Sequence, residues 1–322
     1  MSRHRAGDGV RAPWQPGTRE ALAGGGLDPS WVREFVVRCL AEDMGPGWVD
    51  ITTAVTVPVD DDRRAEVVAD EGGVVAGLLL LPVILAEAGA RLELPVPSAD
   101  LRVHDGARVR PGDVLADLRG PTRVLLVAQR TAVNLLRYLS GVATRTDRWV
   151  SALAGTRTGV LDTCGTTPGL RPLERYAVRC GGGTNGRAGL FDAAHVTAAH
   201  VQASGSLTAA LETVGRRLPS AAVLVSVRTP LEAVEAVHAG ARYLVCDAMA
   251  PEVLAGAVRQ VRAAMLDQVE VAASGPIPLA RAREYARTGV DHLFVEDLTR
   301  GPGVLDVSLL LPQTSLLPAQ RR

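Results

Sequence analysis

Several charged or titratable side chains stand next to short apolar runs in the C-terminal half of the chain. Asp162 and Asp247 each follow such a run directly, and Arg187 and His200 lie in the connections on either side of another. Carboxylates and imidazoles move protons, and guanidinium groups bind carboxylates and phosphates in a forked geometry. These residue types at the ends of apolar runs predict contacts with a small polar ligand.

The cations of this chain are unusual because it contains no lysine, so all 35 of its Lys and Arg residues are arginines. A genome of biased base composition explains that usage most simply. No side chain can therefore act as a Schiff-base amine or as the compact point charge that lysine provides. The formal net charge is zero and the arginines are scattered, which argues against nucleic acid as a partner.

The composition is that of a globular protein in a reducing compartment. Hydrophobic residues make up 47% and charged residues 22% of the 322 residues. The four cysteines form no Cys-x-x-Cys pair, and no charged segment followed by an apolar one opens the chain. The longest apolar run, 74–85, is shorter than the roughly 20 residues of a membrane helix. We expect a cytoplasmic protein without a membrane partner.

The N-terminal part of the chain shows a tail followed by mixed elements. Residues 1–27 are rich in Gly, Arg and Pro without periodicity, which predicts a mobile tail outside the fold. Apolar residues at helical spacing predict a helix over 29–40 and a long one over 125–154. Between them, glycine-punctuated β-type segments predict a small α/β layer, with a hairpin between 65–69 and 74–76.

Strand and helix segments alternate beyond the long helix. Strands are predicted at 159–162, 193–196, 222–227, 243–246, 269–273 and 292–295. Helices are predicted between them, at about 168–180, 204–216, 230–239, 251–266 and 278–287. Such repeats pair in parallel, and the lack of a Gly-x-Gly-x-x-Gly after the first strand favours a barrel over a dinucleotide-binding sheet. Functional residues of a barrel lie at the carboxyl ends of its strands.

Four groups of residues occur in an order and at spacings that together indicate a family. They are Glu42-Asp43-Met44-Gly45-Pro46-Gly47 with Asp50-Ile51-Thr52-Thr53; Arg130-Thr131-Ala132-Val133-Asn134-Leu135-Leu136 with Leu139-Ser140-Gly141-Val142-Ala143-Thr144; Thr166-Thr167-Pro168-Gly169-Leu170-Arg171; and Tyr176-Ala177-Val178-Arg179 with Gly181-Gly182-Gly183. Over about residues 30–311, these motifs make the chain resemble quinolinate phosphoribosyltransferase, also called nicotinate-nucleotide pyrophosphorylase.

The resemblance implies an architecture. The fold class is α/β, with an incomplete six-stranded α/β barrel and an N-terminal α/β sandwich domain. The expected domains are 28–125 for the N-terminal domain, 126–300 for the barrel, and 301–322 for a C-terminal segment that returns to the N-terminal domain. A homodimer is also implied, in which the N-terminal domain of one copy covers the barrel mouth of the other and Arg130 reaches the neighbour's carboxylate ligand.

The resemblance further implies a reaction. In the family, quinolinate attacks the anomeric carbon of phosphoribosyl pyrophosphate in the presence of Mg²⁺, and loss of carbon dioxide yields nicotinate mononucleotide. A dicarboxylate and a polyphosphate held side by side need a strongly cationic pocket. Arginines, lysines and a histidine supply that charge in the family, and carboxylates hold the metal and the sugar.

This chain departs from the family pattern at polar positions near the first four barrel strands. The family's Thr-Arg-Lys-Thr is Thr163-Cys164-Gly165-Thr166 here, its Asn-His-Arg is Asn185-Gly186-Arg187, and its Lys-Asp-Asn-His is Thr197-Ala198-Ala199-His200. The two carboxylates of its Glu-Val-Glu are Leu224 and Ser226, and its Asp-Asn-Met is Asp247-Ala248-Met249. Most of the charge is lost, while Arg187, His200 and Asp247 remain.

The loops that grip phosphate in the family also differ. Its Ser-Gly-Gly is Ser274-Gly275-Pro276 here, and proline offers no backbone N–H to an anion. Its Ser-Val-Gly-Ala is Phe294-Val295-Glu296-Asp297. A carboxylate about 4 Å from a phosphate oxygen costs about 4 kcal/mol at an effective dielectric of about 20. The sequence therefore predicts poor binding of phosphoribosyl pyrophosphate.

The residues expected to contact a ligand are Arg130, Arg171, Arg179, Arg187, His200, Asp247, Ser274 and Gly275. Pairing with Glu or Asp on a helix face remains an alternative role for Arg130. Salt bridges within the protein are likewise an alternative for Arg171 and Arg179, which lie eight residues apart on one predicted helix. Cys164 is interpreted as a small inert residue rather than a nucleophile, because no histidine is adjacent to it. His195 is interpreted as a packed or surface histidine.

Three functions remain open. A divergent enzyme would use the old pocket for a small carboxylate, such as a carboxylated pyridine, without the sugar phosphate. A non-catalytic homologue would act as a binding or regulatory subunit. Retained phosphoribosyl transfer would need the remaining arginines and His200 to replace the missing charges. No cofactor is expected, apart from Mg²⁺ in the last case.

Overall fold

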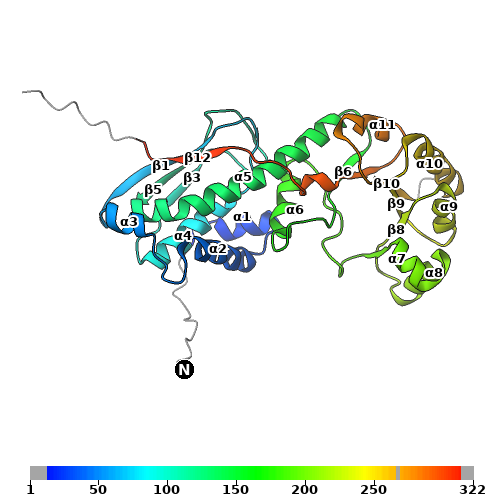
Figure 1. The fold of residues 1–322 in the computed structure, drawn as a ribbon, viewed down its shortest axis with the longest axis horizontal. Coiled ribbons are helices and arrows are strands. Elements are labelled where there is room, and N and C mark those ends of the chain that lie inside the picture. The colour runs from blue at the N-terminus through cyan, green and yellow to red at the C-terminus, as the bar shows by residue number, and fades with distance from the viewer. Residues whose placement is uncertain (1–12, 266–268, 313–322) are drawn as a thin grey trace, which may run out of the picture. The chain divides into compact units, whose positions relative to one another are not determined.

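The computed structural model describes residues 13–265 and 269–312, which divide into two compact units (Figure 1). The first unit runs to Gly141 and resumes at Gly303, and the second is Val142–Pro302. Helix α5 (Thr122–Ala152) contributes to both units. The units therefore divide within this helix, whereas the sequence places a domain boundary at 125.

The first unit is an antiparallel sheet with helices. Its helices are α1 (Thr18–Gly24), α2 (Pro29–Met44), α3 (Ile51–Thr56), the 3₁₀-helix η1 (Leu78–Leu80) and α4 (Leu81–Leu92). Its strands are β1 (Asp62–Ala69), β2 (Gly73–Val74), β3 (Ser98–Leu101), β4 (Arg108–Val109), β5 (Val114–Pro121) and β12 (Val307–Leu310). The four-stranded sheet has the order β12-β1-β5-β3, and β2 pairs separately with β4. The C-terminal strand β12 thus belongs to the first unit.

Two helices form the packed layer of this unit. Asp28 caps α2 by accepting a hydrogen bond from the Trp31 N–H, and the apolar residues Val32, Val36 and Leu40 are fully buried. Helix α4 contacts α2 and is apolar on nearly all sides, as expected of a helix inside the core.

Two expectations for this unit are wrong. Residues 13–27 are not a mobile tail, because they contain α1, whose Leu22 is fully buried; residues 1–12 lie outside the described part of the chain. The segments 65–69 and 74–76 do not pair as a hairpin, because β1 pairs with β5 and β12, and β2 pairs with β4. These partners come from distant parts of the sequence, so local turn signals do not reveal them.

The second unit contains a parallel six-stranded sheet. Its strands are β6 (Gly159–Leu161), β7 (Ala194–Val196), β8 (Val223–Val227), β9 (Tyr243–Asp247), β10 (Glu270–Ser274) and β11 (His292–Phe294). Their order is β6-β11-β10-β9-β8-β7, and all five strand pairs are parallel. The chain bridges β6 again only at Leu161 and Thr184, so β6 and β7 do not pair directly within the described residues. This confirms the expected α/β fold class.

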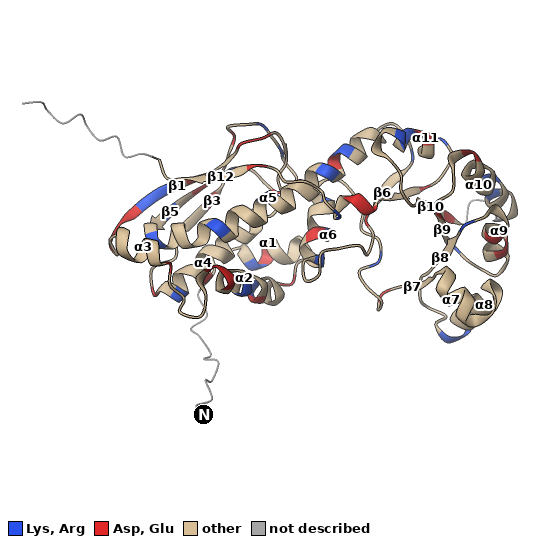
Figure 2. Cartoon of the chain, viewed as in Figure 1, with Lys and Arg blue, Asp and Glu red and all other residues tan. Residues whose placement is uncertain are grey.

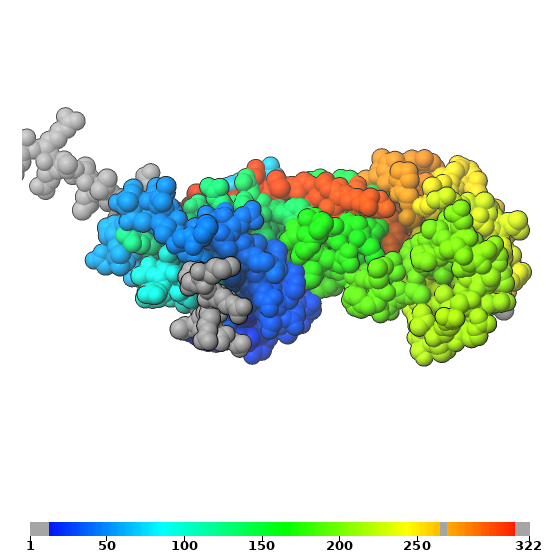
Figure 3. Space-filling view, turned by 60° about the horizontal axis from the view of Figure 1, so that its bottom comes forward, coloured from blue at the N-terminus to red at the C-terminus, as the bar shows by residue number. Residues whose placement is uncertain are grey.

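Helices connect these strands. They are α6 (Arg171–Cys180), α7 (Ala198–Ser204), α8 (Leu207–Arg217), α9 (Pro230–His238), α10 (Pro251–Met265), η2 (Leu279–Arg281), α11 (Ala282–Ala286) and η3 (Glu296–Leu298). Helix α9 packs against both α8 and α10, and Figure 3 shows the green-to-yellow surface of these helices. Helix α7 was not expected; it ends at Gly205, whose φ of 87° separates it from α8.

Charge and apolarity are distributed as in a globular protein. Figure 2 shows the basic residues interspersed with acidic ones rather than gathered in a stripe. In the part of the chain that the structure describes, no helix has the length and apolar character needed to cross a membrane.

Candidate functional site at the strand ends of the second unit

Polar side chains meet at the carboxyl ends of the parallel strands. Asp162 follows β6, His200 lies on α7 just after β7, Asp247 ends β9 and Ser274 ends β10. Asp247 and Ser274 are partners in the β9–β10 register, so they lie side by side at this edge. The edge is where parallel α/β folds place ligands.

A buried carboxylate organises the loop that holds Arg187. Asp162 is 2% exposed, and its two oxygens accept hydrogen bonds from the Gly186 N–H at 2.6 Å and the Asn185 side-chain amide at 2.7 Å. Burial raises the pKa of Asp162, against these hydrogen bonds and the guanidinium of Arg175 at 3.7 Å, which lower it. Asp162 therefore acts within the protein, fixing the backbone that precedes Arg187.

Arg187 has a donor without a partner. One terminal nitrogen donates to the Ala193 carbonyl at 3.3 Å, while its Nε is buried and has no hydrogen-bond partner among the described residues. The side chain lines a cavity of about 430 Å³ inside the barrel and, together with His200, a second one of about 530 Å³ beside β7. A buried donor without an acceptor is costly, and a bound anion would satisfy it.

The two histidines of this region differ in their surroundings. His195 on β7 is half-buried, and its Nε2 lies 2.8 Å from the hydroxyl of Ser226 on β8. Burial lowers the pKa of His195, and the nearby Arg187 and His200 lower it further. His200 is exposed, and its Nδ1 accepts a hydrogen bond from the Thr197 N–H at 3.2 Å, which caps α7.

Three arginines at four-residue spacing on α6 hold loops in place. Arg171 donates to the Thr166 hydroxyl at 2.9 Å and to the Ala188 carbonyl at 3.2 Å. Arg179 donates to the Asn185 side-chain oxygen, and Arg175 donates to the carbonyls of Gly186 and Arg187. Sequence reasoning missed Arg175, although its position four residues from both other arginines places all three on one face.

Asp247 is a poor site for a divalent cation. Its carboxylate lies 3.6 Å from Arg228, and no group of three or more His, Cys, Asp or Glu residues in the described chain could hold a metal ion. Mg²⁺ is bound by one or two carboxylates together with substrate phosphates, and a neighbouring guanidinium opposes it. The residues present do not fit a resident Mg²⁺.

The loop after β10 offers few donors to an anion. Gly275 has a φ of 115°, and a Cβ there would lie 3.0 Å from the Ala248 nitrogen, so this close approach requires glycine. Pro276 has no N–H, and the Ile277 N–H already donates to the Gly275 carbonyl at 2.8 Å.

The two carboxylates after β11 are paired. Glu296 forms a salt bridge with Arg300 at 2.8 Å. Asp297 pairs with Arg145 and accepts a hydrogen bond from the Trp149 indole at 3.1 Å. Repulsion of an anion here is therefore weaker than two unpaired carboxylates would give, which sequence reasoning did not foresee.

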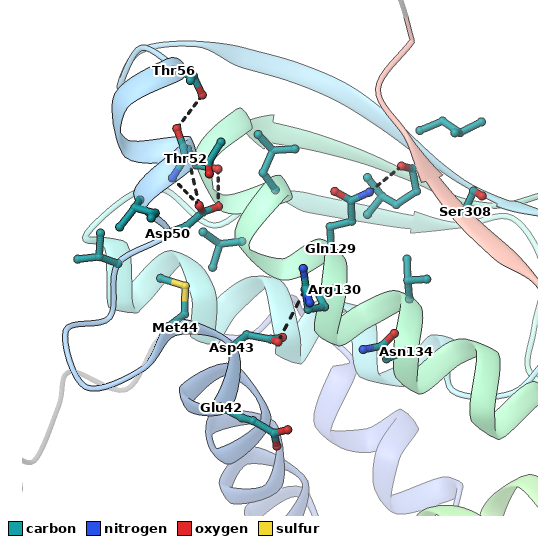
Figure 4. A pocket seen from close by; sticks show the side chains of 18 of the residues that line it. Glu42, Asp43, Met44, Asp50, Thr52, Thr56, Gln129, Arg130, Asn134 and Ser308 are labelled. Atoms are coloured by element: carbon teal, nitrogen blue, oxygen red, sulfur yellow. Dashed lines mark hydrogen bonds and ion pairs between the residues drawn. The ribbon is translucent and has the colours of Figure 1, made fainter.

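Arg130 lies in the first unit, in a pocket of about 1100 Å³ (Figure 4). Its side chain is 77% exposed, with Nε 3.9 Å from the Asp43 carboxylate, which also accepts a hydrogen bond from the Thr131 hydroxyl. Asp50 caps α3 in the same pocket, and its hydrogen bond with Thr53 holds the pKa of Asp50 below its usual range. The other expected ligand residues belong to the second unit.

Comparison with known proteins agrees with this architecture. The family model "Quinolinate phosphoribosyl transferase, N-terminal domain" matches residues 50–140, and the C-terminal domain model matches residues 142–310. The chain belongs to this family. A nicotinate-nucleotide pyrophosphorylase [carboxylating] of Mycobacterium leprae is 38% identical over 86% of this chain and 96% of its own length. The structure of the nicotinate-nucleotide pyrophosphorylase from Francisella tularensis aligns with a TM-score of 0.80 at 30% identity, covering 88% of this chain and 96% of its own.

Two glycines explain how this quinolinate phosphoribosyltransferase family member accommodates its departures from the family pattern. A Cβ at Gly165 would lie 2.8 Å from Nε of Arg300, and a Cβ at Gly186 would lie 3.2 Å from the ring of Phe294. The family motifs place a lysine and a histidine at these two positions. In this chain, side chains from the segment after β10 occupy that space, so the replacements at 165 and 186 go together with Arg300 and Phe294.

Cys164 stands beside the same loop. Its exposed Sγ lies 3.8 Å from the Arg187 carbonyl oxygen. Among the described residues, no histidine forms a hydrogen bond with Cys164, and we still interpret it as an inert residue.

Proposed function

We propose that this family member is a divergent enzyme that binds a small carboxylate at the barrel mouth and does not transfer phosphoribose. The supporting observation is the buried Nε of Arg187, which has no partner among the described residues. Once the Arg187 side chain turns its buried Nε toward the cavity, a ligand carboxylate would accept hydrogen bonds from Nε and a terminal nitrogen together, the forked pairing that guanidinium favours.

The surrounding loop supports this role because it fixes Arg187 before any ligand arrives. Asp162, Arg175 and Arg171 bind the backbone or side chains of residues 185–188 through the hydrogen bonds described above. Such preorganisation lowers the cost of ordering a binding group. Arg171 and Arg179 then act mainly on loop structure, while His200 and Asp247 remain proposed ligand contacts at the mouth.

The phosphate side supports the loss of the family reaction. Ser274 and Gly275 are kept, but Pro276 lacks an N–H and the Ile277 N–H is occupied. The cations at 164 and 165 are absent, and Arg300, which fills the space beside Gly165, is paired with Glu296. A polyphosphate would meet few free donors in this part of the chain.

We also propose a two-fold homodimer in which Arg130 of one copy approaches the ligand of the other. Arg130 is 77% exposed at the pocket of the first unit, and Ile51, which lines that pocket, is 76% exposed. A second copy covering this region would remove exposed apolar surface from water, and two-fold dimers are the commonest soluble oligomers.

Calorimetric titration of a small carboxylate into two variants tests the proposed binding mode. Arg187→Ala should weaken binding by about 1.5 to 3 kcal/mol, the range for hydrogen bonds to charged groups. Glu296→Gly should leave it nearly unchanged, because Glu296 lies on the phosphate side. Equal losses of binding free energy in the two variants would contradict the proposal that the ligand binds on the Arg187 side of the mouth.

A further inference from the structure

The cavity inside the barrel is mainly apolar. Its volume is about 430 Å³, at the lower end of the range of about 300–1,000 Å³ for small-molecule pockets. Leu161, Leu224, Val245, Ala272 and Phe294 are among its lining residues. By resemblance, Leu224 and Phe294 stand where the family has a carboxylate and a serine. The replacements turn a polar wall into one that favours a ring or alkyl group.

Positive charge in the cavity comes from one lining residue of the described chain, Arg187. Burial lowers the pKa of His292, which disfavours the charged form of this second basic side chain of the lining. Glu270 and Tyr243, which also line the cavity, begin their strands and are exposed, and Arg187 donates to the Ala193 carbonyl just before the start of β7. A ligand in this mainly apolar cavity therefore finds one permanent cation to pair with, the guanidinium of Arg187.

Phe294 has a defined place beside this cation. Its ring would contact any Cβ at residue 186 at 3.2 Å, so the glycine next to Arg187 makes room for it. The aromatic edge and the guanidinium thus border the same cavity. Aromatic pairs in offset or edge-to-face contact stabilise each other beyond the effect of buried area alone.

We propose that the barrel cavity holds the ring of an aromatic monocarboxylate, with its single carboxylate on Arg187 and its ring against Phe294. This inference rests on the proposed function and narrows its ligand class. A second carboxylate on the ring would enter apolar surroundings without a counter-charge, which is strongly unfavourable. The site therefore selects against dicarboxylates.

The test is calorimetric titration of the full chain with four probes: benzoate, cyclohexanecarboxylate, phthalate and acetate. Benzoate should bind at least about tenfold more tightly than acetate and than phthalate. Phe294→Ser should weaken benzoate about tenfold and change acetate less than about twofold. Leu231→Ser is the control, because Leu231 is 78% exposed and lines neither of the two cavities that Arg187 borders; it should leave benzoate binding unchanged.

A second variant separates aromatic contact from loss of packing. Phe294→Leu keeps an apolar side chain but removes the aromatic ring. It should therefore weaken the binding of benzoate while changing the affinity for cyclohexanecarboxylate by less than about twofold. Equal affinities for benzoate, acetate and phthalate, or Phe294 variants that change none of them, would overturn the inference. If Arg187→Ala still weakens every probe in that case, the proposed carboxylate site stands. If Arg187→Ala weakens none, the proposed function fails as well.

Discussion

Replacing the buried carboxylate of Asp162 should destabilise the second unit and disable Arg187. In Asp162→Ala, the Gly186 N–H and the Asn185 amide lose acceptors at 2.6 and 2.7 Å, and Arg175, only 18% exposed, loses its counter-charge. Removing one member of a buried ion pair costs about 3 to 5 kcal/mol. The free energy of unfolding, measured by urea denaturation at pH 7, should fall by this amount.

Asp247→Ala is the matched control for this substitution. Asp247 also faces an arginine, at 3.6 Å, but the two side chains are 36% and 68% exposed. Exposed pairs of this kind contribute about 0 to 1 kcal/mol. Similar losses in the two variants would refute the conclusion that Asp162 is the structural anchor of this loop. In a folded Asp162→Ala fraction, benzoate binding should also weaken, because the Arg187 loop is no longer held.

Three further predictions follow from the site. Light scattering at micromolar concentration should give a dimer of the 33.8 kDa chain, and a monomer would contradict the proposed role of Arg130. Quinolinate, phosphoribosyl pyrophosphate and Mg²⁺ should give no nicotinate mononucleotide above background, since each lost positioned donor costs about 2.7 to 4 kcal/mol; turnover near about 1 s⁻¹ would show that transfer is retained. Burial lowers the pKa of His195 from 6.5, so the folded state loses stability as pH falls below that value. In denaturation curves at pH 7 and pH 5, His195→Asn should therefore lose less free energy of unfolding on acidification than the unchanged protein, and equal losses would contradict this.

The repeating part of the fold could be predicted from sequence because its signals are local. Short apolar runs separated by helical patterns mark parallel strands, and each predicted barrel strand lies within a residue or two of an observed one. The strand pairing of the first unit is harder to predict from the sequence. Strand β1 pairs with β12, about 240 residues away in register Val67 to Leu309, and no local pattern reveals that partner. Helix α1 lies among glycines and arginines, and only its tertiary packing buries Leu22.

The site was predictable in its residues but not in their partners. Arg187 and Asp162 stand out at strand ends, yet the sequence does not show that Asp162 binds the backbone before Arg187. It also does not show that Asp297 faces an arginine, because Arg145 is about 150 residues from Asp297, whereas the Glu296–Arg300 pair is local. Long-range ion pairs depend on the fold, and they change the electrostatics that the bare sequence suggests.

The most direct test of the carboxylate site is a crystal structure of the full chain with benzoate. The structure should show the ring inside the barrel cavity beside Phe294, with a carboxylate oxygen about 2.7 to 2.9 Å from Nε of Arg187. Benzoate bound instead beside Arg300 and Glu296, or at Arg130 without contact to Arg187, would contradict the proposed site.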